Sequence, residues 1–184
     1  DGVGLAATQV GVDLSLFVYA CPDANNIVHH GAFCNPVVTL PEGHDRHLEA
    51  ADEGCLSWPG GFQSMARPDL ATCTGQDPWG NDITVTGTGF FARCLQHETD
   101  HCNGIVFGDR LSKRARRKLD EQHDSVAHLY PLWSRGLGDV YKRQHHDVGL
   151  TDPVGRQARP LGTHEQSNFA RVLPQISGEL IEAE

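Results

Sequence analysis

The 184-residue sequence lacks any apolar run long enough to cross a membrane. Its longest apolar stretches, such as "LSLFVYA" from Leu14, are far shorter than the ~20 residues that a spanning helix needs. Basic residues are also scarce, because 15 Lys and Arg stand against 24 Asp and Glu, for a formal net charge of -9. Nucleic-acid phosphates and anionic lipids would repel such a chain. We therefore expect neither DNA nor membrane as a partner, and we expect a cytoplasmic protein.

The sequence also lacks a CxxC pair, although it holds six cysteines. A chain of this length, with 39% hydrophobic and 21% charged residues, fits one soluble globular domain with a sizeable core. Such a domain does not depend on disulfide bonds for its stability, so we expect reduced thiols. A reduced thiol can lose its proton and act as a metal ligand or a nucleophile.

Apolar and β-branched runs predict strands at 14–20 and 32–40, separated by a polar stretch over 21–31. A hairpin is predicted over 70–87, because two further runs flank the turn residues of "DPWGND". Together these runs indicate a protein with several short strands.

Two helices are predicted in the second half of this region. Apolar residues at three- and four-residue spacing indicate a helix that begins at Thr88 or Gly89 and ends before "NG" at 103–104. A second helix over 112–122 has Ser112 as its N-cap and cationic residues on its exposed side. Short strands and a central helix predict an α+β fold with mostly antiparallel strands around that helix.

The segment 131–184 shows no sustained periodicity. Its "GDVYKRQ" at 138–144 resembles a translated sequencing adapter. This segment is either a poorly ordered tail or, after about Trp133, an artefact of assembly. We expect a catalytic domain over 1–130 and a tail over 131–184.

The stretch "LQHETDHC" places His97 and His101 four residues apart on the first predicted helix. Residues at this spacing lie within roughly 40° of each other around the axis, so both imidazoles can grip one ion. Glu98 lies between them and suits a general base that acts on a metal-activated water. Cys102 lies roughly 100° further round, which argues against it as a ligand of the same ion.

The residues alone leave the third ligand open. The pattern HExxHxxGxxH would need a histidine where this chain has Phe107. Another group of metallopeptidases uses a glutamate on a following helix, and Glu121 stands roughly where that ligand is required. Cys55, in "DEGCLSWPG", is the other candidate.

Three ordered motifs, "GVGLAATQVG", "EGCLS" and "QHETDH", strongly resemble the signature motifs of the peptide deformylases. The similarity extends from residue 1 to about 120, and "TGTGFFARCLQHETDH" looks most like the actinobacterial members. The resemblance implies that Cys55, His97 and His101 hold one divalent iron. A thiolate ligand would also suit Zn(II), Ni(II) or Co(II), and three protein ligands leave a tetrahedral position open.

The resemblance further implies hydrolysis of the N-formyl group from the first methionine of new polypeptides, with release of formate. Glu98 would move the proton, while the amide of Gln9 and the backbone N–H of Leu56 would stabilise the negative oxygen. Gly4 would let the peptide approach the backbone closely. The implied partners are N-formylmethionyl peptides and the ribosome with its nascent chain, and the basic "KRARRK" is the candidate contact.

The chain departs from the family pattern at its start. Deformylases carry several tens of residues before "GVGLAATQVG", and the single methionine here is Met65, so we expect an N-terminal part to be missing. Two rival functions stay open. One is a metallopeptidase that uses His97, His101 and Glu121, and the other is an inactive deformylase-like scaffold that binds metal.

Overall fold

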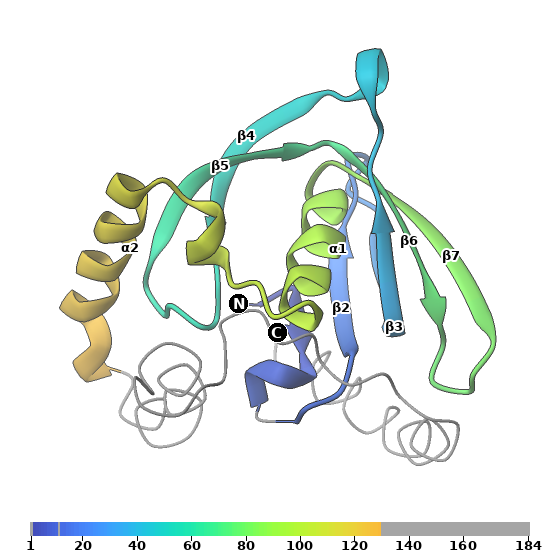
Figure 1. The fold of residues 1–184 in the computed structure, drawn as a ribbon, viewed down its shortest axis with the longest axis horizontal. Helices are drawn as coiled ribbons and strands as arrows, with labels where there is room; N and C mark the ends of the chain where they lie inside the picture. The colour runs from blue at the N-terminus through green and yellow to red at the C-terminus, as the bar shows by residue number, and fades with distance from the viewer. Residues whose placement is uncertain (1, 11, 130–184) are drawn as a thin grey trace.

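The computed structural model describes residues 2–10 and 12–129, so the predicted tail over 131–184 lies outside the described residues. The described chain contains a five-stranded and a two-stranded antiparallel sheet. Figure 1 shows the helix α1 (Gly89–Cys102) in the middle of the molecule, between the larger sheet and the smaller one. This arrangement confirms the predicted α+β fold of antiparallel strands around the HExxH helix.

The larger sheet has the strand order β1-β2-β3-β6-β7. Its strands are β1 (Gly4–Ala6), β2 (Leu16–Pro22), β3 (Val28–Thr39), β6 (Leu70–Gln76) and β7 (Asp82–Thr88). The smaller sheet, called the ribbon below, pairs β4 (Leu48–Gly54) with β5 (Phe62–Pro68). The remaining elements are the helix α2 (Lys113–Val126) and the 3-10 helices η1 (Ala7–Val10), η2 (Gly43–Asp45), η3 (Phe107–Arg110) and η4 (Ala127–Leu129).

The main core lies between α1 and the larger sheet. Phe17 and Phe33 from the sheet meet Phe91 and Leu95 from α1, and all four side chains are fully buried. Each buried side chain of this size contributes about 1.5–3 kcal/mol. The apolar spacing that predicts α1 thus identifies the helix face that faces the sheet.

The two predicted helices are confirmed, with one changed boundary. Asn103 caps α1, and Gly104 adopts a φ of 73° while its N–H bonds the carbonyl of His101. Ser112 caps α2 through a hydrogen bond from the N–H of Ala115 at 3.3 Å. α2 continues to Val126, beyond the predicted residue 122. Within the described residues, no helix is long and apolar enough to span a membrane.

The predicted hairpin over 70–87 is also confirmed, as strands β6 and β7. Asp77 closes its turn by accepting the N–H groups of Trp79 and Asn81 at 2.9 and 2.8 Å. The connection between β2 and β3 is shorter than the polar stretch predicted over 21–31, because the two strands pair as far as Pro22 and Val28 and leave only 23–27 between them. Backbone hydrogen bonds hold the ends of these strands together, and such bonds do not require an alternation of apolar side chains that the sequence would reveal.

Helix α2 packs on the ribbon through a second cluster of buried side chains. Leu119, which is fully buried, contacts a group that includes Trp58, Phe107 and Cys55. The indole Nε1 of Trp58 donates to Asp120 at 3.0 Å. α2 therefore supports the turn that carries Cys55.

We expect Leu119→Ala to lower the free energy of unfolding by about 2–5 kcal/mol, because it leaves a cavity in this cluster. Urea unfolding followed by circular dichroism measures the change. Lys118→Ala, at the exposed neighbouring position, is the control and should change stability by less than about 0.5 kcal/mol. A loss below 1 kcal/mol for Leu119→Ala would contradict the proposed packing role.

Candidate metal centre

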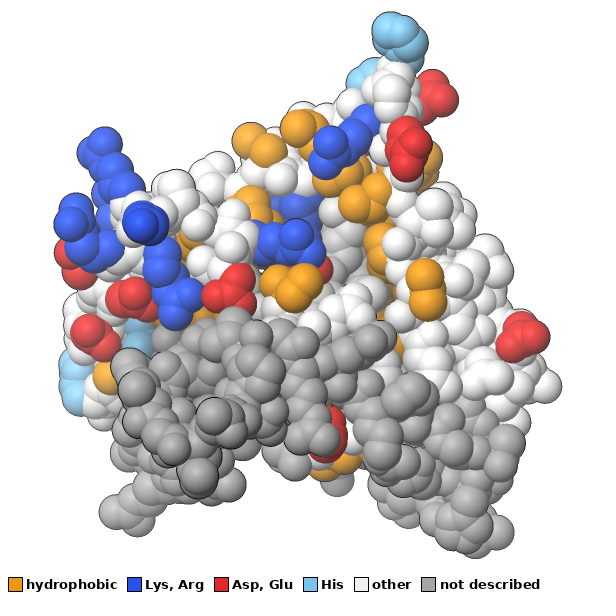
Figure 2. Space-filling model, in the orientation of Figure 1, with side chains coloured by type: hydrophobic (Ala, Val, Ile, Leu, Met, Phe, Trp, Pro, Cys, Tyr) orange, Lys and Arg blue, Asp and Glu red, His pale blue; other side chains and the backbone are white. Residues whose placement is uncertain are grey.

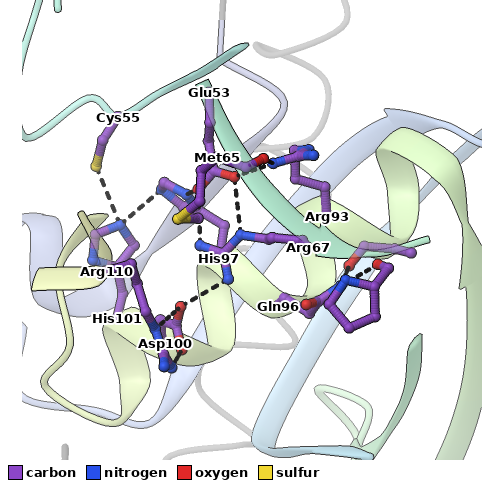
Figure 3. Close-up of polar contacts among 12 residues, drawn as sticks. Glu53, Cys55, Met65, Arg67, Arg93, Gln96, His97, Asp100, His101 and Arg110 are labelled. Atoms are coloured by element: carbon purple, nitrogen blue, oxygen red, sulfur yellow. Dashed lines mark hydrogen bonds and ion pairs between the residues drawn. The ribbon is translucent and has the colours of Figure 1, made fainter. Parts of the chain in front are cut away.

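The candidate metal centre lies where the end of the ribbon meets α1. Cys55 follows the last residue of β4, and His97 and His101 lie on α1. The Sγ of Cys55 is 3.4 Å from the Nε2 of His101, which is 3.1 Å from the Nε2 of His97 (Figure 3). All three side chains are buried, and the three atoms lie within 4.8 Å of one another. The structure thus brings together the three residues that the deformylase resemblance implies.

The two short distances in this cluster, from His101 to Cys55 and to His97, suit a single divalent cation. A tetrahedral ion with bonds of about 2.1 Å to nitrogen and 2.3 Å to sulfur holds its ligand atoms about 3.4–3.6 Å apart. The two observed distances, 3.4 and 3.1 Å, lie within a few tenths of an ångström of that range. The donor set of one sulfur and two imidazole nitrogens also suits a borderline metal such as Fe(II) or Zn(II).

Glu53, which the sequence analysis did not single out, fixes the orientation of His97. Its Oε1 lies 2.7 Å from the Nδ1 of His97 and accepts from Arg67 at 2.8 Å. Its Oε2 accepts from Arg67 at 2.9 Å and from Arg93 at 2.8 Å. Because the carboxylate accepts a hydrogen bond from Nδ1–H, the Nε2 lone pair of His97 is left for a metal.

The polar network continues behind the histidines. Arg67 also donates to Asp100 at 3.0 Å, and Asp100 pairs with Arg110 at the surface (Figure 3). Glu53, Arg67 and Arg93 are each no more than 6% exposed. A sequence signal for Glu53 exists, because residues two apart on a strand point to the same side and Glu53 precedes Cys55 by two. Arg67 comes from the distant strand β5, and Arg93, although it lies one turn before His97 on α1, finds its partners on the distant ribbon, so neither leaves such a local signal.

Burial and neighbouring charge act in opposite directions on the pKa values of the cluster. Burial would raise the pKa of Cys55, but His101 and His97 hold it well below its usual value. Burial would lower the pKa of His97, but Cys55 and Glu53 hold it well above its usual value. The cluster therefore favours a thiolate, which is the form that binds metal, and a metal must compete with the proton of His97.

Glu98 lies beside the cluster in a contrasting environment. Its side chain is buried, and within the described residues its Oε2 has no hydrogen-bond partner. Burial raises the pKa of Glu98 above its ordinary value of 4.5. Gly4 of β1 packs against this carboxylate so closely that an added Cβ would collide with it. A carboxyl group with a raised pKa holds its proton more tightly than an exposed one and is suited to proton transfer.

Gln9 and Leu56 line the same pocket. The Oε1 of Gln9 accepts the N–H of Ala6 at 2.9 Å, so its Nε2 faces Cys55 Sγ at 3.9 Å and Ser57 Oγ at 3.5 Å. The pocket has a volume of about 430 Å³ and is lined by all the predicted site residues except His101. Its wall also includes Trp58 and three α1 residues that precede His97, namely Phe90, Arg93 and Cys94.

Glu121, the rival third ligand, and Cys102, which helix geometry argued against, both lie elsewhere. The side chain of Glu121 is 68% exposed and pairs with Arg117 at 3.8 Å on the outer face of α2. Cys102 is 1% exposed and belongs to the main core. The structure therefore does not favour a site built on His97, His101 and Glu121.

We expect Cys55→Ser to weaken Co(II) or Zn(II) binding by ~100-fold or more, because it replaces a thiolate with a poor ligand. Chelator competition measures the affinity, and the thiolate-to-cobalt absorption should disappear. Cys102→Ala and Glu121→Gln are the matched controls and should keep the affinity within about threefold. Equal loss in Glu121→Gln and none in Cys55→Ser would reverse the assignment.

Comparison with known proteins gives one family. The family model described as polypeptide deformylase matches residues 1–117. Peptide deformylase 1 of Streptomyces avermitilis is 53% identical over 133 residues, which are 72% of this chain and 61% of that protein. Peptide deformylase 2 of Streptomyces coelicolor is 49% identical over 121 residues, which are 66% of each chain. The chain thus spans less than two thirds of the length of these relatives.

Solved structures agree with the sequence relatives. A peptide deformylase from Legionella pneumophila superimposes with a TM-score of 0.59 at 36% identity, over 70% of this chain and 72% of that one. A peptide deformylase from Synechococcus elongatus, in complex with actinonin, superimposes with a TM-score of 0.56 at 35% identity, over 69% and 66% of the two chains. With the family model matching well over half of its residues, this chain belongs to the polypeptide deformylase family.

Proposed function

We propose that this protein is a metal-dependent hydrolase that removes the formyl group from the N-terminal methionine of nascent polypeptides and releases formate. One observation carries the proposal: in a chain of the deformylase family, a buried Cys55, His97 and His101 converge beside a carboxyl oxygen of Glu98 that has no hydrogen-bond partner among residues 2–10 and 12–129. That combination supplies both a cation site and a proton acceptor in one pocket.

The ligands in this proposal are Cys55, His97 and His101, and the ion is Fe(II), with Zn(II), Ni(II) or Co(II) as substitutes. When bound, the ion supplies Lewis acidity that polarises the formyl carbonyl and lowers the pKa of water. Three protein ligands leave room for substrate, as in other catalytic sites. Glu53 keeps His97 in the required tautomer by accepting from its Nδ1.

Glu98 is the proposed general base. Its carboxylate takes a proton from the attacking water and returns it to the amine nitrogen as the C–N bond of the formamide breaks. Burial raises the pKa of Glu98 above its ordinary value, and a carboxylate with a higher pKa is a stronger base. Formate and a free amino terminus are the products.

Gln9 and Leu56 are the proposed donors to the negative oxygen of the tetrahedral intermediate. The hydrogen bond from Ala6 holds the amide of Gln9 with its Nε2 toward Cys55. A fixed donor of this kind contributes about 10²–10³-fold in rate. Gly4 belongs to β1, where an extended peptide can approach the backbone closely because no side chain intervenes.

The ribosome with its nascent chain is the proposed partner, and the cytoplasm is the proposed location. Lys113, Arg114, Arg117 and Lys118 are exposed on α2. Figure 2 shows the Lys and Arg side chains gathered over this helix. In a chain with a net charge of -9, this local basic surface is the feature best suited to ribosomal RNA.

Formate release from formyl-Met-Ala-type peptides tests the activity. With Fe(II) or Ni(II) under reducing, anaerobic conditions, we expect turnover, and Glu98→Gln should lower kcat by about 10²–10⁴-fold while metal stays bound. Glu121→Gln, the matched control on α2, should keep wild-type activity. If folded, metal-loaded protein releases no formate, the proposed activity is wrong and the protein is an inactive scaffold that binds metal.

The pH profile gives a second test of Glu98. A general base must be deprotonated, so activity rises with pH through the pKa of Glu98. Because burial raises that pKa, we expect the acid limb of kcat/KM to lie above 4.5. The profile is measured over the range where circular dichroism and metal content stay constant. An acid limb at or below 4.5 would contradict this role.

A further inference from the structure

The metal ligands come from two parts of the molecule that share no sheet. Cys55 belongs to the end of the ribbon, whereas His97 and His101 belong to α1, which packs mainly on the larger sheet. The ribbon strands pair only with each other among the described strands. The distance between the sulfur and the two imidazoles therefore depends on the side chains that fasten the ribbon to α1.

Arg93 makes that connection from the helix. It lies one turn before His97 and is 5% exposed. Its Nη1 donates to the Oε2 of Glu53 at 2.8 Å and to the carbonyl of Met65 at 2.9 Å. Its Nη2 donates to the carbonyl of Glu49 at 2.8 Å. One helical side chain thus bonds both strands of the ribbon (Figure 3).

Arg67 acts differently, although it belongs to the same network. It lies on β5, so its two bonds to Glu53 remain inside the ribbon. Its bond to the helix goes to Asp100, three residues after His97. The ribbon is therefore held to α1 on both sides of His97, by Arg93 before it and by the Arg67–Asp100 pair after it.

We propose that Arg93 is a positioning residue of the metal centre, which holds the ribbon against α1 and so sets the approach of Cys55 to the two histidines. The inference rests on the ligand set of the proposed function. Arg93 lines the substrate pocket, but its donor groups are directed at Glu53 and at two backbone carbonyls. Its effect on the metal therefore passes through the ribbon and through Glu53.

Co(II) binding to Arg93→Gln and Arg93→Lys tests the inference independently of turnover. We expect Arg93→Gln to weaken Co(II) affinity by about 10–100-fold, as measured by chelator competition. The thiolate-to-cobalt absorption should also weaken, because the sulfur no longer approaches at its proper distance. Arg93→Lys keeps the charge and a donor, so its affinity should be intermediate.

Arg110→Gln is the matched control. It removes an arginine–carboxylate pair from the same network, but Arg110 bonds Asp100 and does not bond the ribbon. We expect its cobalt affinity and spectrum to match those of the wild type. Wild-type affinity and spectrum in Arg93→Gln, or equal losses in Arg93→Gln and Arg110→Gln, would overturn the inference.

Chemical rescue of Arg93→Ala tests the inference even if the substitutions at Arg93 reduce folding. Arg93→Ala opens space that joins the substrate pocket, so millimolar guanidinium can enter and replace the lost group. Recovery of cobalt affinity with guanidinium, but not with sodium, would support positioning, and no recovery would overturn it. Formate release is measured separately. A wild-type protein that binds cobalt without releasing formate would defeat the proposed function and leave the inference on Arg93 standing.

Discussion

The buried carboxylate of Glu53 is the interaction on which the candidate site depends. Each of its oxygens takes part in two hydrogen bonds, with His97, Arg93 and twice with Arg67. A buried charge is costly unless it is paired and fully hydrogen-bonded, and here every acceptor position is used. The same bonds join β4, β5 and α1. The hydrogen bonds that stabilise the charge of Glu53 therefore also align the segments that carry Cys55 and His97.

Two glutamates in this site experience opposite environments. Glu53 keeps its charge because the donors around it, His97 and Arg67, outweigh burial and hold its pKa well below the usual value. In the part of the chain that the structure describes, the Oε2 of Glu98 has no hydrogen-bond donor, and burial raises the pKa of Glu98. Although both residues are glutamates, Glu53 is thus suited to orienting His97, and Glu98 is suited to transferring a proton.

Local patterns in the sequence predict only part of this arrangement. The spacing of apolar residues gives α1, and the HExxH spacing places both histidines on one face. The ribbon has little apolar alternation, because its strands carry the charged network, so no pattern predicts it. Cys55 and Glu121 stay equal candidates until the resemblance favours Cys55, since a ligand from another segment depends on tertiary packing. Arg67, Arg93 and Asp100 escape prediction because their hydrogen-bond partners also lie on another segment.

The buried charged network contributes to the geometry of the site more than to the stability of the fold. Replacing a buried ion network with apolar side chains of similar volume is often neutral or stabilising. Such a replacement here would leave His97 without its Nδ1 acceptor and the ribbon without its directional bonds to α1. Apolar contacts are non-directional and could keep the segments packed, but they would not fix the directions in which the sulfur and the two nitrogens point. The network is therefore better explained by the geometry that a metal requires than by the free energy of folding.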